Sequence, residues 1–134
     1  MSVVVDAYAW LELFLGGPRG VKVREIVESA ESVYTPGTVL AEISRKYLRE
    51  DVAEKIVRER LSAIQAASRI VHITPELAVS ASRAYLELSD RARKKRLNSP
   101  SLFDGIVLGT TRLKGAKVVT GDPHFKDLPE TVWV

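Results

Sequence analysis

The sequence predicts an α/β fold in which helices cover one mostly parallel sheet of five short strands. Short apolar runs rich in valine and isoleucine alternate with longer segments of helical periodicity. This order is typical of a parallel sheet with crossover helices. The chain has 134 residues and is 46% hydrophobic, enough for one ordinary core. Because it contains no repeat or linker, we expect a single domain over residues 1–134.

The N-terminal part of the chain is predicted to form strand, helix, helix and strand. Val3–Val5 is a short β-branched run, typical of a buried strand. A helix is expected over Tyr8–Leu15, ended by two glycines and a proline at 16–18. Val21–Ala30 has apolar residues at helical spacing. Ser32–Tyr34 is predicted to be the second strand.

Two further helices are predicted before the middle of the chain. Thr35 and Pro36 are typical of a helix start, with threonine as N-cap and proline at the first helical position. The apolar stripe of this helix consists of Val39, Leu40, Ile43 and Tyr47. Val52–Ala67 is a long amphipathic segment. Its expected inward-facing residues are Ile56, Leu61 and Ile64.

The C-terminal half is predicted to complete the sheet with three more strands. Ile70–Ile73 is the third strand, and a helix is expected over Pro75–Leu88. Pro100 is expected to open another helix. Val118–Val119 lies between glycines and is the fourth strand, while Thr131–Val134 is a short fifth strand.

Four acidic residues fall where strands should end and helices begin: Asp6, Glu42, Asp104 and Asp122. Ligands of parallel sheets bind beyond the carboxyl ends of the strands, where the strand order reverses. If the first and fourth strands are neighbours there, Asp6 and Asp122 face each other. Carboxylates without nearby cysteine or paired histidine suit Mg²⁺ or Mn²⁺ better than zinc. Such a metal suits phosphoryl chemistry without a protein nucleophile.

Each acid also has a simpler structural explanation. Asp6 and Asp122 could only cap the helices that follow them. Asp104 completes a capping-box pattern, and Glu42 could form an exposed ion pair with Lys46 one turn later. The four together favour a site, because serine, threonine and asparagine cap helices equally well.

Composition excludes several classes of function. The chain has no cysteine, which excludes disulfides, thiolate metal sites and a cysteine nucleophile and fits a cytoplasmic protein. No apolar run approaches the roughly 18 residues of a membrane span, and the start lacks a signal-peptide pattern. A net charge of +3 permits a polyanionic partner.

His72 is expected to be structural within a strand, whereas His124 is close enough to Asp122 to affect it.

The chain resembles the PIN-domain nucleases, and within them the compact toxins of the VapC type. The resemblance covers nearly the whole chain through four short motifs in the family's order. They are VVVDAYAWLE, TVLAEISRKYL, SLFDGIVLGTTR and VVTGDPHFKDL. Each motif alone is degenerate, but the four in order at familiar spacing make a fairly specific match.

The resemblance implies a PIN-like three-layer α/β/α fold and a site for Mg²⁺ or Mn²⁺. By position, the metal-site acids would be Asp6, Glu42, Asp104 and Asp122. Thr120 would hydrogen-bond a carboxylate or water beside the metal. The implied activity is metal-dependent endonucleolytic hydrolysis of RNA phosphodiesters. Gly105 stands where the family more often has alanine, and we expect it to loosen the helix start without removing a ligand.

The resemblance also implies partners. Toxins of this type are inhibited by an antitoxin whose C-terminal segment packs between helices, and they commonly form homodimers. Tyr47, Trp10 and Phe14, with the helices at 38–49 and 52–67, are candidate contact surfaces, although Trp10 and Phe14 are more typical of core residues. The basic run Arg91–Arg96 could attract an RNA backbone or could be a solvated helix end.

Other functions remain open from the sequence. A PIN nuclease that processes RNA without an antitoxin would have the same motifs. A receiver-like signalling domain would need two adjacent acids after the first strand, and an aspartate-nucleophile phosphohydrolase would need Asp-x-Asp there. The chain has only Asp6 followed by Ala7 and Tyr8. A non-catalytic binding protein on the same fold is disfavoured because all four acids are present.

Overall fold

The protein consists of one five-stranded sheet with helices on both sides. The computed structural model describes residues 1–134. The strands are β1 (Ser2–Val5), β2 (Ser32–Pro36), β3 (Arg69–Val71), β4 (Lys117–Thr120) and β5 (Thr131–Trp133). The helices are α1 (Ala7–Leu15), α2 (Pro18–Ser29), α3 (Gly37–Arg49), α4 (Glu54–Ala67), α5 (Pro75–Lys95), α6 (Leu102–Leu113) and the 3-10 helix η1 (Pro123–Phe125). None of these helices has the length and apolarity needed to cross a membrane.

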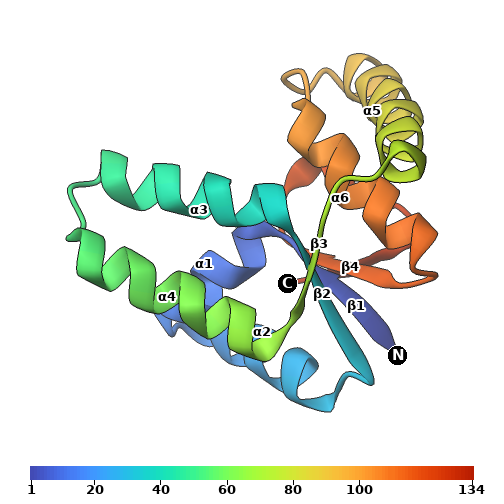
Figure 1. Cartoon of the computed structure of the whole chain (residues 1–134). Helices are drawn as coiled ribbons and strands as arrows, with labels where there is room; N and C mark the ends of the chain where they lie inside the picture. Colours follow the sequence, from blue (N-terminus) through green and yellow to red (C-terminus); the bar gives the residue numbers. More distant parts are fainter.

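The predicted α/β fold with three layers is confirmed, and the sheet is parallel throughout. Its strand order is β3-β2-β1-β4-β5, and each neighbouring pair is parallel. Figure 1 shows α5 and α6 together on one side of the sheet, with α1, α2, α3 and α4 grouped away from them. Because the chain builds outward from β1 to β3 and then returns to β4, the strand order reverses between β1 and β4.

The two central strands supply the middle of the core. Val3, Val4 and Val5 of β1 are fully buried, as are Val118 and Val119 of β4. Strands covered on both faces need apolar residues at every position, which explains the continuous valine runs. Thr120 at the end of β4 and Asp6 directly after β1 therefore bring polar side chains to the carboxyl edge of a buried sheet.

The predicted helix start at Thr35 and Pro36 is wrong, because both residues belong to β2. Thr35 is fully buried, and its hydroxyl accepts a hydrogen bond from Trp10 Nε1 at 3.1 Å. It also shares a hydrogen bond with the Ser68 hydroxyl at 2.8 Å. These buried contacts hold the threonine in the strand, and α3 begins at Gly37 with Pro36 as its N-cap.

Several other boundaries differ from the sequence prediction. The helix expected from residue 52 begins at Glu54, and the third strand covers 69–71 instead of 70–73. The helix expected to end at Leu88 continues to Lys95, so most of the basic run is helical. The helix expected at Pro100 begins at Leu102. Ile56 was expected inside but is 41% exposed, because Val57 and Ile64 take the buried positions of α4.

Helices α5 and α6 pack so closely that two glycines are required between them. A Cβ atom on Gly105 would lie 2.6 Å from the carbonyl oxygen of Ala81, and one on Gly109 would lie 2.8 Å from the Ala81 nitrogen. Both clashes are with backbone, which cannot rotate away. Gly105 therefore permits the close approach of α5, a role that the sequence did not indicate.

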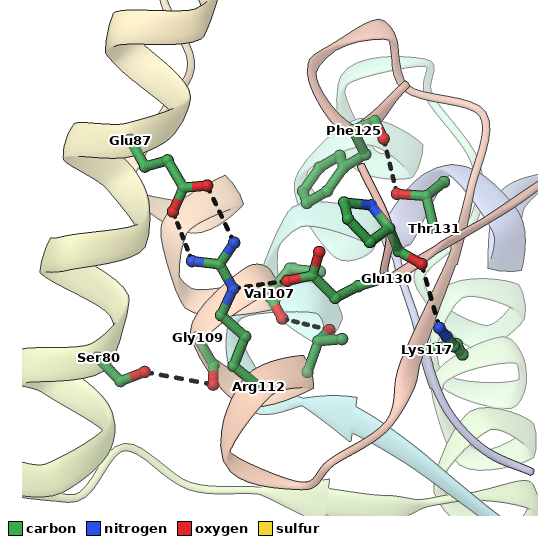
Figure 2. Close-up of polar contacts among 11 residues, drawn as sticks. Ser80, Glu87, Val107, Gly109, Arg112, Lys117, Phe125, Glu130 and Thr131 are labelled. Carbon is green, nitrogen blue, oxygen red and sulfur yellow. Dashed lines mark hydrogen bonds and ion pairs between the residues drawn. The ribbon is translucent and has the colours of Figure 1, made fainter. Parts of the chain in front are cut away.

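The C-terminal end of α6 is tied to its neighbours by Arg112. Its guanidinium contacts Glu87 of α5 at 2.6 and 3.1 Å and Glu130 before β5 at 2.7 Å, as Figure 2 shows. The hydrogen bonds to Glu87 are the main cause of the raised pKa of Arg112. Bidentate pairing of this kind is geometrically specific, so it fixes α6 relative to both α5 and the last strand.

We predict that Gly109→Ala lowers the free energy of unfolding by about 1 to 3 kcal/mol, because the new methyl group would push α6 away from α5. Urea denaturation followed by circular dichroism measures this change. Gly17→Ala is the matched control, since φ is −74° there and an added Cβ meets nothing within 4 Å. Equal losses in the two variants would contradict the close-packing explanation.

Candidate metal centre

Asp6 and Asp122 follow the two strands at which the strand order reverses. In β1 and β4, Val5 pairs with Val119, so the residues that follow them lie at the same level of the sheet. The backbone N–H of Asp6 donates to the carbonyl of Val119 at 3.2 Å. The prediction that these strands are neighbours at the switch point is therefore confirmed, and it places both acids at one edge.

Asp6 has a buried carboxyl group that accepts two hydrogen bonds. Only 5% of the residue is exposed. Its Oδ1 accepts from the backbone N–H of Ala7 at 2.8 Å, so it also caps α1. Its Oδ2 accepts from the hydroxyl of Thr120 at 2.8 Å. The hydrogen bond expected between Thr120 and a carboxylate is thus present.

The Thr120 hydroxyl also contacts the second acid. It accepts a hydrogen bond from the backbone N–H of Asp122 at 3.0 Å. Thr120 is fully buried, so this arrangement is shielded from water. One hydroxyl therefore links the Asp6 side chain to the backbone that carries Asp122. The expected capping role of Asp122 is also observed, because its Oδ1 accepts from the His124 backbone N–H at 2.9 Å.

Asp104 is held at the first turn of α6 by the predicted capping box. Its Oδ2 accepts from the backbone N–H of Ser101 at 2.8 Å, and the Asp104 backbone N–H donates to the Ser101 hydroxyl. The observed carboxylate contacts all use Oδ2, leaving Oδ1 for a ligand. Ligand atoms of Asp104, Asp122 and His124 lie within 4.8 Å of one another. A single ion could contact all three residues.

Glu42 is half-buried on α3, as its place beside the apolar stripe predicted. The ion pair suggested between Glu42 and Lys46 is absent, because Lys46 Nζ pairs with Glu50 at 3.1 Å. Burial raises the pKa of Glu42 to about 7, and the charges of Asp6, Asp104 and Asp122 add to the effect. All four predicted acids therefore lie within range of one another's charge.

Asp6, Glu42, Asp104 and Asp122 surround the carboxyl ends of β1 and β4, a region called the acidic crevice below. The electrostatics of this crevice favour a proton or a cation. Burial is the main cause that raises the pKa of Asp6 to about 7, against the Thr120 hydrogen bond and together with the charges of Asp122 and Asp104. Burial also raises the pKa of Asp104. Carboxyls that are both desolvated and crowded resist ionisation together. A bound divalent cation would keep them ionised, and hard oxygen donors fit Mg²⁺ or Mn²⁺.

His124 is a part of the crevice that the sequence indicated only weakly. Its Nδ1 lies 3.0 Å from Asp122 Oδ1, and its Nε2 lies 2.7 Å from the carbonyl oxygen of Asn98. Burial lowers the pKa of His124, but the Asn98 carbonyl and the Asp122 charge outweigh it and the net shift is upward. Nothing in the sequence pairs His124 with Asn98, because the contact joins η1 to the loop before α6, 26 residues earlier in the chain. His72, expected inside a strand, is instead exposed just after β3.

The basic run Arg91–Arg96 lies beside η1, close to this crevice. Arg91 Nη2 and Lys95 Nζ donate to the carbonyl of Lys126 at 3.0 and 3.5 Å. Arg93 and Lys94 instead pair with Asp90 on the solvent side. The run is therefore a solvated helix end of which part reaches the segment after Asp122.

Solved structures of the same fold include several toxin–antitoxin proteins. VapC20 of Mycobacterium tuberculosis, described as a sarcin-ricin loop cleaving toxin, superposes with a TM-score of 0.74 and 21% identity over 98% of each chain. A DNA-bound VapBC complex of Salmonella typhimurium gives 0.68 and 14%, covering 100% of this chain and 97% of that one. PAE2754 of Pyrobaculum aerophilum gives 0.68 and 14%, covering 100% and 90%.

These likenesses concern the fold, because their sequence identities are low. The comparison with curated proteins found no match. The family model described as PIN domain matches residues 3–131. That span contains β2, β3 and β4, all but the first residue of β1, the first residue of β5, and all four acids. This chain therefore belongs to the PIN domain family.

Proposed function

We propose that this protein is a metal-dependent endoribonuclease, with one nuclease domain over residues 1–134. The observation that carries the proposal is the grouping of four acids around the β1–β4 switch point: Asp104 and Asp122 can share one ion with His124, and Asp6 and Glu42 lie near enough to feel their charges, with the pKa of each raised to about 7. A site that gathers acids at this energetic cost is more typical of function than of capping. The sarcin-ricin loop cleaving toxin of the same fold supports cleavage of RNA.

In this proposal Asp6, Glu42, Asp104 and Asp122 hold Mg²⁺ or Mn²⁺. The ion, when bound, would polarise a water molecule and stabilise charge on the phosphoryl oxygen. The protein's own groups orient the ligands: Thr120 fixes Asp6, and the capping box at Ser101 fixes Asp104. No cysteine or serine–histidine pair is required, which suits the composition.

An RNA backbone would meet positive charge beside the acids. A cavity of about 350 Å³ adjoins Glu42 and is also lined by Arg45 and Arg49 of α3, and by Lys46, which pairs with the lining residue Glu50. The guanidinium of Arg45 lies 6.0 Å from the ring centre of Phe103, the residue before Asp104. These cations would attract phosphates toward a crevice that is itself acidic.

We further propose a cytoplasmic toxin that has an antitoxin partner and forms a homodimer. The complexes among the similar structures support a partner protein. A cavity of about 490 Å³ lies between α1, α3 and α4 and is lined in part by Tyr8, Phe14 and Tyr47. Arg60 lies 4.7 Å from the Tyr47 ring centre at its wall. Trp10 is a core residue, 2% exposed, and contributes only to the floor of the neighbouring cavity.

We predict that Asp6→Asn lowers the rate of RNA cleavage by roughly a hundredfold or more, the usual loss when one electrostatic stabiliser is removed. Cleavage of labelled single-stranded RNA with Mg²⁺, with Mn²⁺ and with EDTA measures it. Asp51→Asn is the control, since Asp51 is exposed and its φ of 59° suits asparagine. Full activity in Asp6→Asn would sink the site, and RNA binding without metal-dependent cleavage would favour a non-catalytic module.

We predict that Thr120→Val weakens Mn²⁺ binding by about 10- to 100-fold, as expected when a group that orients a ligand is lost. The change keeps the side-chain volume but removes the hydrogen bond to Asp6, so the pKa of Asp6 should rise further. Isothermal titration calorimetry measures the affinity. Thr111→Val is the matched control, because that buried hydroxyl donates only to the Val107 carbonyl within α6. Equal losses in both variants would argue against the orienting role.

We predict that the metal-free protein loses thermal stability as pH rises from about 4.5 to about 7.5. Asp6 and Glu42 have ordinary pKa values of 3.8 and 4.5 and folded values of about 7, so the folded state binds more protons in that window. The raised pKa of His124 acts in the same direction. Saturating Mn²⁺ should raise Tm more at the upper end. If Tm depended on pH in the Asp6→Asn variant as it does in the unchanged protein, the pH dependence could not come from Asp6.

A further inference from the structure

Trp133 is an exposed aromatic residue near the acidic crevice. It ends the edge strand β5 and is 39% exposed, whereas the other tryptophan, Trp10, is 2% exposed. One exposed apolar side chain is ordinary on a protein surface. Trp133 differs from such a residue in its position relative to Asp6 and in the charges that surround it.

Strand pairing fixes how far Trp133 lies from the acids. Trp133 pairs with Thr120, and Val119 pairs with Val5 directly before Asp6. Adjacent strands are about 4.8 Å apart, so the backbones of Trp133 and Asp6 are separated by about 10 Å, two strand spacings. Paired residues place their side chains on the same face of a sheet, so Trp133 shares the face of Thr120.

One ammonium group lies against this indole ring, and three further cationic side chains contact the backbone of Trp133 or Lys126. The ammonium of Lys126 lies 5.5 Å from the ring centre, and Lys22 Nζ donates to the Trp133 carbonyl at 2.6 Å. Arg91 and Lys95 of α5 donate to the carbonyl of Lys126. Asp127 lies next to Lys126 in the chain, and its carboxylate pairs with Lys95 at 3.6 Å. The patch is therefore cationic beside an aromatic face.

An aromatic face with lysines at its border matches single-stranded nucleic acid. A base stacks on the ring, while the ammonium groups contact the phosphates on either side. A duplex keeps its bases stacked inside and offers no free base face. Lys126 is exposed and carried on a flexible side chain, so it can move from the ring to a phosphate when a base arrives.

We propose that Trp133 and Lys126 form a base-stacking subsite for a nucleotide that flanks the cleaved phosphodiester. This inference rests on the ribonuclease function proposed above. The subsite binds and positions RNA, and it takes no part in the chemical step. It contributes affinity without base identity, because every base has a face that can stack.

Tryptophan fluorescence tests the subsite directly, since Trp10 is buried and Trp133 is exposed. Short single-stranded RNA would be added to the Asp6→Asn protein, which binds without cutting. We expect quenching that disappears in Asp6→Asn combined with Trp133→Phe. The same sequence as a duplex should quench little. Strong quenching by single-stranded RNA that persists in the Trp133→Phe protein would overturn the assignment.

Affinity measured by anisotropy of labelled RNA gives the second readout. Trp133→Leu, which keeps apolar bulk but removes the stacking face, should weaken binding about tenfold, and Trp133→Phe should restore most of it. Lys126→Gln should weaken binding and reduce the salt dependence. Lys55→Gln on the exposed side of α4 is the charge-matched control and should do neither.

The outcomes separate this inference from the proposed function. Asp6-dependent cleavage with RNA affinity unchanged in Trp133→Leu would overturn the subsite and leave the nuclease intact. Absence of both RNA binding and metal-dependent cleavage would overturn the proposed function and the subsite with it. Quenching and a Trp133-dependent affinity without cleavage would show base stacking on Trp133, but it would overturn the nuclease and with it the place of that base beside a cleaved phosphodiester.

Discussion

The hydroxyl of Thr120 joins the two acids on which the crevice depends. It donates to the Asp6 carboxyl and accepts from the Asp122 backbone, and it is fully buried while doing so. Because β1 and β4 are neighbours at the switch point, one side chain can reach both residues. The other acids take their places around this pair, from α3 and from the first turn of α6.

This arrangement of acids lowers the free energy of unfolding of the protein. Asp6 is desolvated, and Glu42 lies near three other acids, so the pKa of each is raised to about 7. Folding forces these carboxyls together although each would be more stable, as a charged group, in water. The rest of the molecule has to supply the difference through core packing. A bound cation would offset this repulsion, so affinity for a metal and lower stability without one would have the same origin.

Cationic side chains lie on two sides of the crevice, and helix α6 lies between them. On the α3 side, Arg45 and Arg49 line a cavity next to Glu42. Near η1, the end of α5 brings Arg91 and Lys95 to the segment after Asp122. Helix α6 carries Asp104 between these regions, and its position depends on the glycine contacts with α5 and on Arg112. A change in helix packing would therefore move an acid of the site without altering any acid.

The sequence by itself determined the α/β class, the order of the elements and the positions of the four acids, because valine runs, helical periodicity and capping patterns are local signals. The resemblance to PIN-domain nucleases also indicated the hydrogen bond from Thr120. The sequence misplaced the start of α3, since Thr35 stays in β2 through contacts with Trp10 and Ser68 that lie far away in the chain. The need for Gly105, the contact of His124 with Asn98 and the cationic border of Trp133 were decided only by the tertiary structure. Each of them depends on which surfaces meet after the chain has folded, and no local pattern encodes that meeting.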